Sequence, residues 1–242
     1  MSLVALRKVS KTYEVGETAI RALQDVDLDI QPESFVAFVG PSGSGKTTLL
    51  NLIGCLDKPS SGEVTVADAR VNGFTPREAA LFRGKHLGFI FQGFNLLPVL
   101  TVFENVAYPL MMVQNVPEKP RRDRVMSYLE AVGMADQKDK YPSQISGGQK
   151  QRTAVARALV TDPKLVLADE PTANLDHASA FMVIELMRRM QKDLKTTFIF
   201  STHDPKIMQE AEILYTLEDG RITNHEILEP RASQSSPEGE TR

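Results

Sequence analysis

Residues 35–50 read FVAFVGPSGSGKTTLL, and this stretch decides the fold. Its first five residues, Phe35–Val39, are wholly apolar, which is typical of a strand that is buried on both faces of a parallel sheet. Residues 40–47 then fit the pattern G-x-x-x-x-G-K-[ST], and a helical stretch, Thr48–Leu56, follows. The order of strand, glycine-rich loop and helix predicts a loop whose backbone N–H groups converge on the phosphates of a nucleotide.

The residue types of this loop suit a nucleotide. Lys46 places a positive charge between the β- and γ-phosphates, and the Thr47 hydroxyl can bind Mg²⁺. The helix that follows points the positive end of its dipole toward the anion. The alternative is a glycine- and serine-rich connector, but the strand before the loop and the helix after it favour nucleotide binding. The residues predicted to bind the nucleotide here are Gly40, Pro41, Ser42, Gly43, Ser44, Gly45, Lys46, Thr47 and Thr48.

Three more short apolar stretches predict further strands of the same buried sheet: Leu87–Phe91, Leu165–Ala168 and Phe198–Phe200. Helical patterns lie between them. Over residues 183–194, for example, apolar side chains recur every three or four positions, with charged residues on the opposite face. This alternation predicts an α/β fold with a mostly parallel sheet.

Polar residues follow the ends of these predicted strands. Gln92, the pair Asp169-Glu170 and His203 all stand just beyond a carboxyl end, which is the edge where open α/β sheets bind ligands. Asp169 would hold Mg²⁺ through water, and Glu170 could polarise the attacking water as a general base. Taken alone, the Asp-Glu pair is more often a solvated turn, and a histidine at a helix start is usually unremarkable. Their shared edge favours the nucleotide site.

The N-terminal part of the chain differs from this core. Residues 4–9, 20–30 and 63–66 mix β-branched and polar side chains, which is typical of extended structure. Asp25–Ile30 alternates strictly between acidic and apolar residues, as in a strand with one wet face. We therefore expect an antiparallel β subdomain at the edge of the domain.

The middle of the chain, from about Gly93 to Val160, predicts helices and no clear strand. Thr101 and Glu104 form the pattern of a capping box, and helical stretches follow at 121–132 and 147–160. We expect an inserted α-helical subdomain at about residues 93–160. The α/β core would then cover about 1–92 and 161–228 of a single domain over residues 1–228, and residues 229–242 would form a disordered tail.

A pair of glycines opens the third helical stretch. Ser146 and Gln149 form an S-x-x-Q capping box, which explains those two residues but not Gly147 and Gly148 between them. Each glycine costs about 1 kcal/mol relative to alanine inside an exposed helix. Bare backbone at a helix N-terminus is a good anion site, so the sequence predicts a second contact with a γ-phosphate here.

Composition excludes several classes of protein. The chain has 242 residues, 42% hydrophobic and 24% charged, and can bury an ordinary core, which excludes disorder throughout, a collagen-like repeat and a disulfide-stapled mini-protein. The net charge of -3 argues against a protein that coats nucleic acid. Cys55 is the only cysteine and fits a reducing compartment. No apolar run approaches the roughly 18 residues of a membrane-spanning helix, so we expect a cytosolic chain or one held at a membrane by partners.

Six motifs in order resemble those of the ATPase subunit of an ATP-binding cassette (ABC) transporter, over about residues 3–225. Residues 40–47 match Walker A, LVLADE at 165–170 matches Walker B with its catalytic glutamate, and Ile145–Gln149 matches the signature motif, usually LSGGQ. The remaining three motifs are the Q-loop at Gln92, the D-loop at residues 173–176 and the switch histidine at His203. Tyr13 additionally matches the aromatic residue that stacks on adenine. Ile145 and Asn174 are mild departures from the family pattern.

This resemblance implies a mechanism. Two copies would sandwich two ATP molecules head to tail, with the signature turn of one copy on the γ-phosphate held by Lys46 of the other. Hydrolysis through Glu170 would release the dimer. The residues implied to be catalytic are Glu170, His203 and Gln92; those implied to hold Mg²⁺ are Thr47, Gln92 and Asp169. Beyond the phosphate loop, Tyr13, Ser146, Gly147, Gly148, Gln149 and Asp176 are implied to contact ATP.

Two segments narrow the resemblance. GCLDKPSSGEV at 54–64 and GFIFQGFNLLPVLTVFENVAYPL at 88–110 are similar to the cassette subunits of lipoprotein-releasing systems and macrolide-type exporters. Such a subunit would sit on the cytoplasmic face of the inner membrane, held by a separate integral membrane protein, with no nucleic-acid partner. A regulatory cassette that partners a cell-division membrane protein is the open alternative. A GTPase is excluded because no asparagine is followed by lysine in an N-K-x-D motif.

Three further segments carry weaker expectations. Residues 94–100 (FNLLPVL) could form part of a groove for a helix of the membrane subunit, or simply the core of the helical subdomain. We expect Met111 and Met112 to lie in the core. The basic run at 119–124 predicts a solvated helix start rather than a lipid contact.

Overall fold

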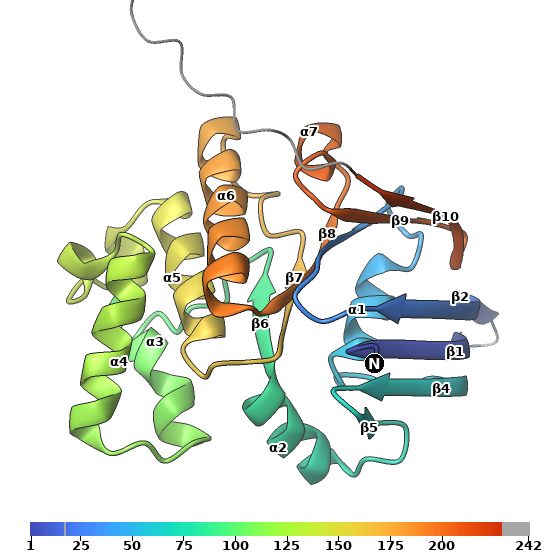
Figure 1. Ribbon diagram of the computed structural model, residues 1–242, viewed down its shortest axis with the longest axis horizontal. Coiled ribbons are helices and arrows are strands. Elements are labelled where there is room, and N and C mark those ends of the chain that lie inside the picture. The colour runs from blue at the N-terminus through green and yellow to red at the C-terminus, as the bar shows by residue number, and fades with distance from the viewer. Residues whose placement is uncertain (17, 229–242) are drawn as a thin grey trace, which may run out of the picture.

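The computed structural model, which describes residues 1–16 and 18–228, contains two sheets and a group of helices (Figure 1). The tail predicted at 229–242 lies outside the described residues. The strands are β1 (Val4–Val15), β2 (Thr18–Ile30), β3 (Phe35–Val39), β4 (Ser61–Val66), β5 (Ala69–Arg70), β6 (Leu87–Phe91), β7 (Leu165–Asp169), β8 (Thr197–Thr202), β9 (Ile213–Glu218) and β10 (Arg221–Ile227). The helices are α1 (Lys46–Ile53), α2 (Pro76–His86), α3 (Val102–Met112), α4 (Glu118–Ala131), α5 (Gly147–Leu159), α6 (His177–Leu194) and α7 (Pro205–Met208), with short 3₁₀ turns η1 (Ala135–Gln137) and η2 (Pro142–Gln144).

The larger sheet has six strands in the order β10-β9-β3-β8-β7-β6, and only the β9–β10 pair is antiparallel. All four strands that the apolar stretches predict are present as neighbours. The side chains of β3 alternate between two separate cores, with Phe35, Ala37 and Val39 in one and Val36 and Phe38 in the other. The sheet is therefore covered on both faces, as predicted.

Helices and the smaller sheet provide the two covers. Helices α3–α6 pack on one face, in a single apolar cluster that runs from the sheet to α4, while α1 and the four-stranded sheet pack on the other (Figure 1). The division of the chain into core and subdomain at residues 93 and 160 stays a prediction.

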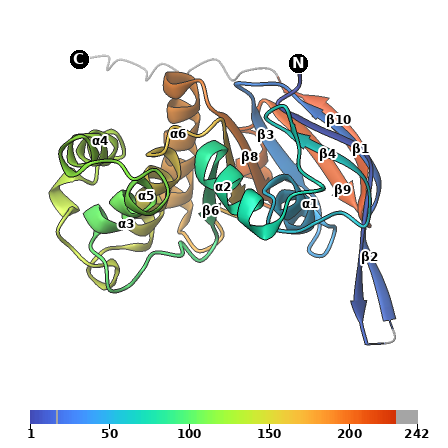
Figure 2. The ribbon, with the colours of Figure 1, turned by 90° about the horizontal axis from the view of Figure 1, so that it is seen from below.

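The smaller sheet, in the order β2-β1-β4-β5, is antiparallel throughout, as expected for the N-terminal part. Val26, Leu28 and Ile30 are buried, whereas the aspartates between them face solvent. The paired strands β1 and β2 project at one end beyond the rest of the described residues (Figure 2).

The helical segment confirms the two predicted capping boxes. In α3, Thr101 Oγ1 accepts from the Glu104 backbone N–H and the Glu104 carboxylate accepts from the Thr101 N–H, and Ser146 and Gln149 do the same for α5. Helix α2 has a third capping box, between Thr75 and Glu78, and was not predicted. Its few apolar residues do not recur at helical spacing, so the sequence does not predict this helix.

The burial of Met111, Met112 and the basic run at 119–124 can be compared with what the sequence predicts. Met111 and Met112 are 44% and 58% exposed, so their assignment to the core is wrong. Helix α3 buries the face of Val102, Val106 and Leu110, and both methionines fall outside that face at its C-terminal end. The basic run at 119–124 lies in the first turns of α4 and is largely exposed, as predicted.

Candidate nucleotide site

The phosphate loop joins β3 to α1 and is shaped by its glycines. Gly40 and Gly45 have φ angles of 143° and 104°, which lie in the left-handed region that favours glycine. The Lys46 side chain is buried and folds back over the loop, where its Nζ donates to Gly40 O at 2.8 Å and Pro41 O at 2.9 Å. Helix α1 has no side-chain cap and no acidic residue in its first turn. Its first N–H groups are therefore available to an anion.

A second strand end meets this loop. The Thr47 hydroxyl lies 3.1 and 3.0 Å from the two carboxylate oxygens of Asp169, at the end of β7. The Ser201 hydroxyl of β8 donates to Asp169 Oδ1 at 2.7 Å. A hydroxyl and a carboxylate are hard oxygen ligands of the kind that Mg²⁺ takes, so the residues present fit this ion.

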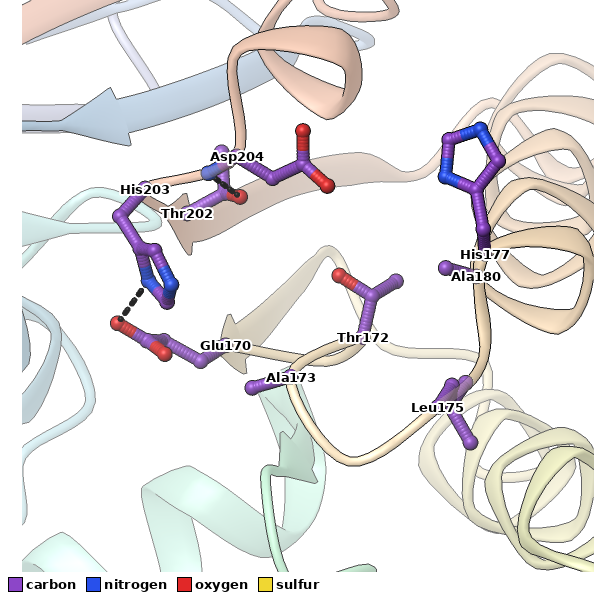
Figure 3. Close-up of a pocket in the computed structure, with 9 residues that line it drawn as sticks. All are labelled: Glu170, Thr172, Ala173, Leu175, His177, Ala180, Thr202, His203 and Asp204. Carbon is purple, nitrogen blue, oxygen red and sulfur yellow. Dashed lines mark hydrogen bonds and ion pairs between the residues drawn. The ribbon is translucent and has the colours of Figure 1, made fainter.

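The third meeting point is between Glu170 and His203. Glu170 leaves β7 with φ of 44°, and its Oε1 lies 3.2 Å from Nδ1 of His203, which follows β8. The two side chains line one side of a cavity of about 280 Å³, with His177 across from them (Figure 3). A carboxylate held beside an imidazole at the phosphate edge can accept a proton from a bound water.

Gln92 also lies at this edge, because Phe91, the last residue of β6, pairs with Asp169 in β7. The Gln92 side chain is exposed, and its backbone carbonyl accepts from Nδ2 of Asn174 at 2.9 Å. The asparagine that departs from the family pattern thus ties the loop after β7 to the loop after β6.

Tyr13 stands at the other end of the site, held by charged neighbours. Its hydroxyl donates to Asp57 Oδ2 at 2.7 Å, and Nζ of Lys11 lies 4.7 Å from the centre of its ring while pairing with Asp57 Oδ1 at 2.7 Å. Thr48 of α1 also hydrogen-bonds with the Tyr13 hydroxyl. Burial and the bond to Asp57 raise the pKa of Tyr13. The ring is therefore fixed beside the start of the phosphate-loop helix.

The signature turn lies apart from the phosphate loop. Helices α5 and α1 lie on opposite sides of β8 in both views (Figures 1 and 2). The backbone around Gly147 is half-buried near Leu175 and Phe94, and Ser146 is exposed. A single copy of the chain therefore does not bring Ser146–Gln149 to the phosphates that Lys46 would hold.

Asp176 has a structural role in the described chain. Its Oδ1 accepts from the Ser179 N–H at 3.0 Å and caps the N-terminus of α6. Hydrogen bonds from Ser179 lower the pKa of its carboxyl group. Contact of Asp176 with a nucleotide stays a prediction.

Sequence reasoning missed three residues that shape the site. Ser201 bonds to Asp169, and Lys11 and Asp57 fix Tyr13. Ser201 was visible only as a polar residue after an apolar strand, and Lys11 and Asp57 are 46 positions apart. No local pattern connects them.

Within the described residues, no helix combines the length and apolar character needed to cross a membrane.

Known proteins match this chain along most of its length. Residues 23–173 match the family model for the ABC transporter. The macrolide export ATP-binding/permease protein MacB of Syntrophobacter fumaroxidans is 42% identical over 223 residues, which cover 92% of this chain and 31% of MacB. The chain thus spans about a third of the length of that relative.

A second relative matches over its whole length. The uncharacterized ABC transporter ATP-binding protein MJ0796 of Methanocaldococcus jannaschii is 40% identical, over 93% of this chain and 97% of MJ0796. A solved dimeric structure of MJ0796, in a post-hydrolysis state bound to ADP and Pi, matches with a TM-score of 0.86 at 39% identity, covering 94% of this chain and 99% of that one. The chain therefore belongs to the ABC transporter family: it is an ATP-binding cassette, an ATPase that uses ATP and Mg²⁺.

Proposed function

We propose that this cassette dimerises around two ATP molecules and energises a separate membrane protein of the lipoprotein-release or macrolide-export class. The observation that carries the proposal is the meeting of three strand ends at one edge: the phosphate loop after β3, Asp169 and Glu170 after β7, and His203 after β8. The similarity to MacB supports the class of membrane partner.

The side chains divide the work of hydrolysis. Lys46 and the N–H groups of the loop and α1 would hold the β- and γ-phosphates. Glu170 accepts a proton from the attacking water, and His203, 3.2 Å away, keeps that carboxylate oriented. Thr47, Asp169 and Gln92 would hold Mg²⁺, which neutralises charge on the phosphates when bound.

The signature turn supports assembly with a second copy. Ser146 and Gln149 cap the start of α5, and no phosphate loop of the same copy meets Gly147 and Gly148 there. The relative MJ0796 has been solved as a dimer. The γ-phosphate held by Lys46 of one copy would therefore complete its contacts on Ser146–Gln149 of the other.

A surface for the membrane partner lies where α2 meets the end of α3. We define the α2–α3 surface as the exposed residues Leu81, Tyr108, Met111, Met112 and Val113, which are 40–60% exposed. It adjoins a cavity of about 240 Å³ lined by Tyr108 and Pro109 among others. Leu97 and Val99, 40% and 78% exposed, belong to the neighbouring segment 94–100. Exposed apolar side chains beside a cavity fit an apolar helix of a partner.

The first experiment tests hydrolysis and dimerisation together. Glu170→Gln should keep ATP affinity, lose at least about 100-fold in kcat because the general base is gone, and elute as a dimer in ATP on size-exclusion chromatography. Glu185→Gln, at an exposed position of α6, is the matched control and should behave as wild type. A Glu170→Gln protein that stays monomeric in ATP contradicts the proposed sandwich.

The second experiment tests the partner. A tagged chain purified from detergent extracts should retain an integral membrane protein with a large periplasmic domain and few spans. Met112→Glu should lose that protein, whereas Met182→Glu should keep it, since Met182 on α6 is 57% exposed and Met112 is 58% exposed. Retention of a cell-division membrane protein instead would overturn the proposed transporter class.

A further inference from the structure

One buried hydroxyl joins the two carboxylates of the site. Ser201 lies in β8 and has no exposed surface. Its Oγ donates to Asp169 Oδ1 at 2.7 Å and accepts from the backbone N–H of Glu170 at 2.8 Å. A single side chain thus contacts the carboxylate proposed to hold Mg²⁺ and the backbone of the proposed general base.

The sheet explains why this hydroxyl matters. Strands β7 and β8 pair in parallel from Leu165 with Thr197 to Ala168 with Phe200, and the pairing ends there. Glu170, two residues further, turns out of the strand with φ of 44°, a conformation that is strained for a residue with a side chain. Its N–H is accepted by Ser201 Oγ in place of a strand carbonyl. The hydroxyl therefore holds the turn that aims Glu170 toward His203.

Asp169 is fixed from two sides by the same arrangement. The Ser201 hydroxyl approaches Oδ1 from β8, and the Thr47 hydroxyl approaches the carboxylate from α1. Among the residues that the structure describes, loss of Ser201 would leave Thr47 as the one side chain bonded to the Asp169 carboxylate and would leave the Glu170 N–H without its acceptor. Both changes act on the orientation of Asp169 and Glu170.

We propose that Ser201 is a positioning residue for ATP hydrolysis, which sets the orientation of Asp169 and Glu170 through its one hydroxyl. This inference rests on the roles proposed above for those two carboxylates. Ser201 has no exposed surface, so we expect its effect in kcat rather than in the binding of ATP.

The test compares two buried hydroxyls at opposite ends of β8. Ser201→Ala should lower kcat at least about tenfold and change the KM for ATP less than about twofold. Ser201→Thr, which retains the hydroxyl, should recover most of the rate. Thr197→Val is the matched control, because Thr197 is equally buried and its Oγ1 accepts from the Glu33 N–H at 2.8 Å, away from the site. It should lower the melting temperature and leave kcat unchanged.

The outcomes separate this inference from the proposed mechanism. A Ser201→Ala protein with wild-type kcat, or a loss of kcat that Thr197→Val reproduces, overturns the positioning role. If Ser201→Ala does not fold, Ser201→Gly replaces it, because it also lacks any donor or acceptor on the side chain, and a wild-type kcat there overturns the role equally. Glu170→Gln is assayed alongside: full turnover by that variant refutes the role of Glu170 itself, whereas an inactive Glu170→Gln with a fully active Ser201→Ala refutes only the role of Ser201.

Discussion

The glycines of the phosphate loop and those of the signature turn are required for different reasons. A Cβ on Gly40 would lie 2.1 Å from Leu217 O, and one on Gly45 would lie 2.5 Å from Ala22 O, so the fold of the chain itself demands both. A Cβ on Gly147 would meet nothing closer than a methyl of Leu175 at 3.4 Å, which is ordinary contact. Neither Gly147 nor Gly148 has a positive φ.

The difference indicates whether each pair of glycines is required by contacts within the chain or by a contact outside it. The phosphate loop is built by its own chain, since backbone carbonyls of distant segments leave no space for a side chain at Gly40 or Gly45. The signature turn already has its cap from Ser146 and Gln149, and its packing leaves room for a methyl group at Gly147. We take the reason for Gly147 to lie outside the chain, in a phosphate carried by a second copy.

The largest effect is expected from the phosphate loop. Lys46→Ala removes the buried ammonium and its bonds to Gly40 O and Pro41 O, so ATP affinity should fall about 100-fold or more and hydrolysis with it. Equilibrium binding of a fluorescent ATP analogue measures this, with the exposed Lys192→Ala as control. Unchanged affinity would remove Lys46 from the site.

A change in the signature turn should separate hydrolysis from folding. Gly147→Ala should lower kcat about 100-fold and abolish the ATP-dependent dimer in a Glu170→Gln background, while one copy still binds ATP. Its melting temperature should stay equal or rise, since alanine favours helix. Gly40→Ala is the contrast: it should destabilise the fold strongly, as measured by thermal unfolding. A Gly147→Ala protein that unfolds as easily would erase the distinction between the two regions.

The Tyr13 ring, which is predicted to stack on adenine, should behave like the phosphate loop, because residues of the same chain hold it. Asp57→Asn weakens the hold on the Tyr13 hydroxyl and on Lys11. The KM for ATP should rise a few-fold, about 1 kcal/mol or less, with kcat unchanged. Steady-state kinetics decides this, and a fall in kcat at constant KM would place Asp57 in another role.

The smallest expected effect is on the stability of the fold at acidic pH. Burial raises the pKa of Asp57, but hydrogen bonds from Lys11, Tyr13 and the Lys58 N–H outweigh it, so the pKa is lowered overall. A lowered pKa stabilises the fold above the value of the unfolded chain, and that contribution is lost as the pH falls through the folded pKa. Below about pH 4, the free energy of unfolding should therefore fall further in wild type than in Asp57→Asn. The extra loss should be about 1 kcal/mol or less. Equal acid sensitivity in thermal unfolding would contradict this.

Much of the fold follows from local sequence patterns. The exceptions are segments whose burial depends on what packs against them. The four predicted strands have apolar centres because both faces of the sheet are covered. Strand β9 escaped prediction because its sequence, ILYTLE, includes half-buried and exposed positions near the edge of the sheet. Met111 and Met112 were misplaced because their apolar character says nothing about which face of α3 is covered.

The residues of the candidate site also divide into those that local patterns predict and those that they do not. Lys46, Thr47, Asp169, Glu170 and His203 were predictable because each follows a recognisable strand, and the structure joins Thr47 to Asp169 and Glu170 to His203. Ser201 was not, since its role depends on where the pairing of β7 with β8 stops. Such a property belongs to the register of a sheet, and no single segment records it.

The close packing of Leu217 against Gly40 affects the order in which the fold can form during synthesis. Strand β3 pairs with β8 and β9, and the carbonyl that fixes Gly40 belongs to Leu217, almost 180 positions later in the chain. A ribosome that has made the phosphate loop must translate nearly the whole cassette before that loop can close. At about 5–20 residues per second, the nascent chain spends roughly ten seconds or more without a finished ATP site. The packing of Leu217 against Gly40 can therefore form only late in translation.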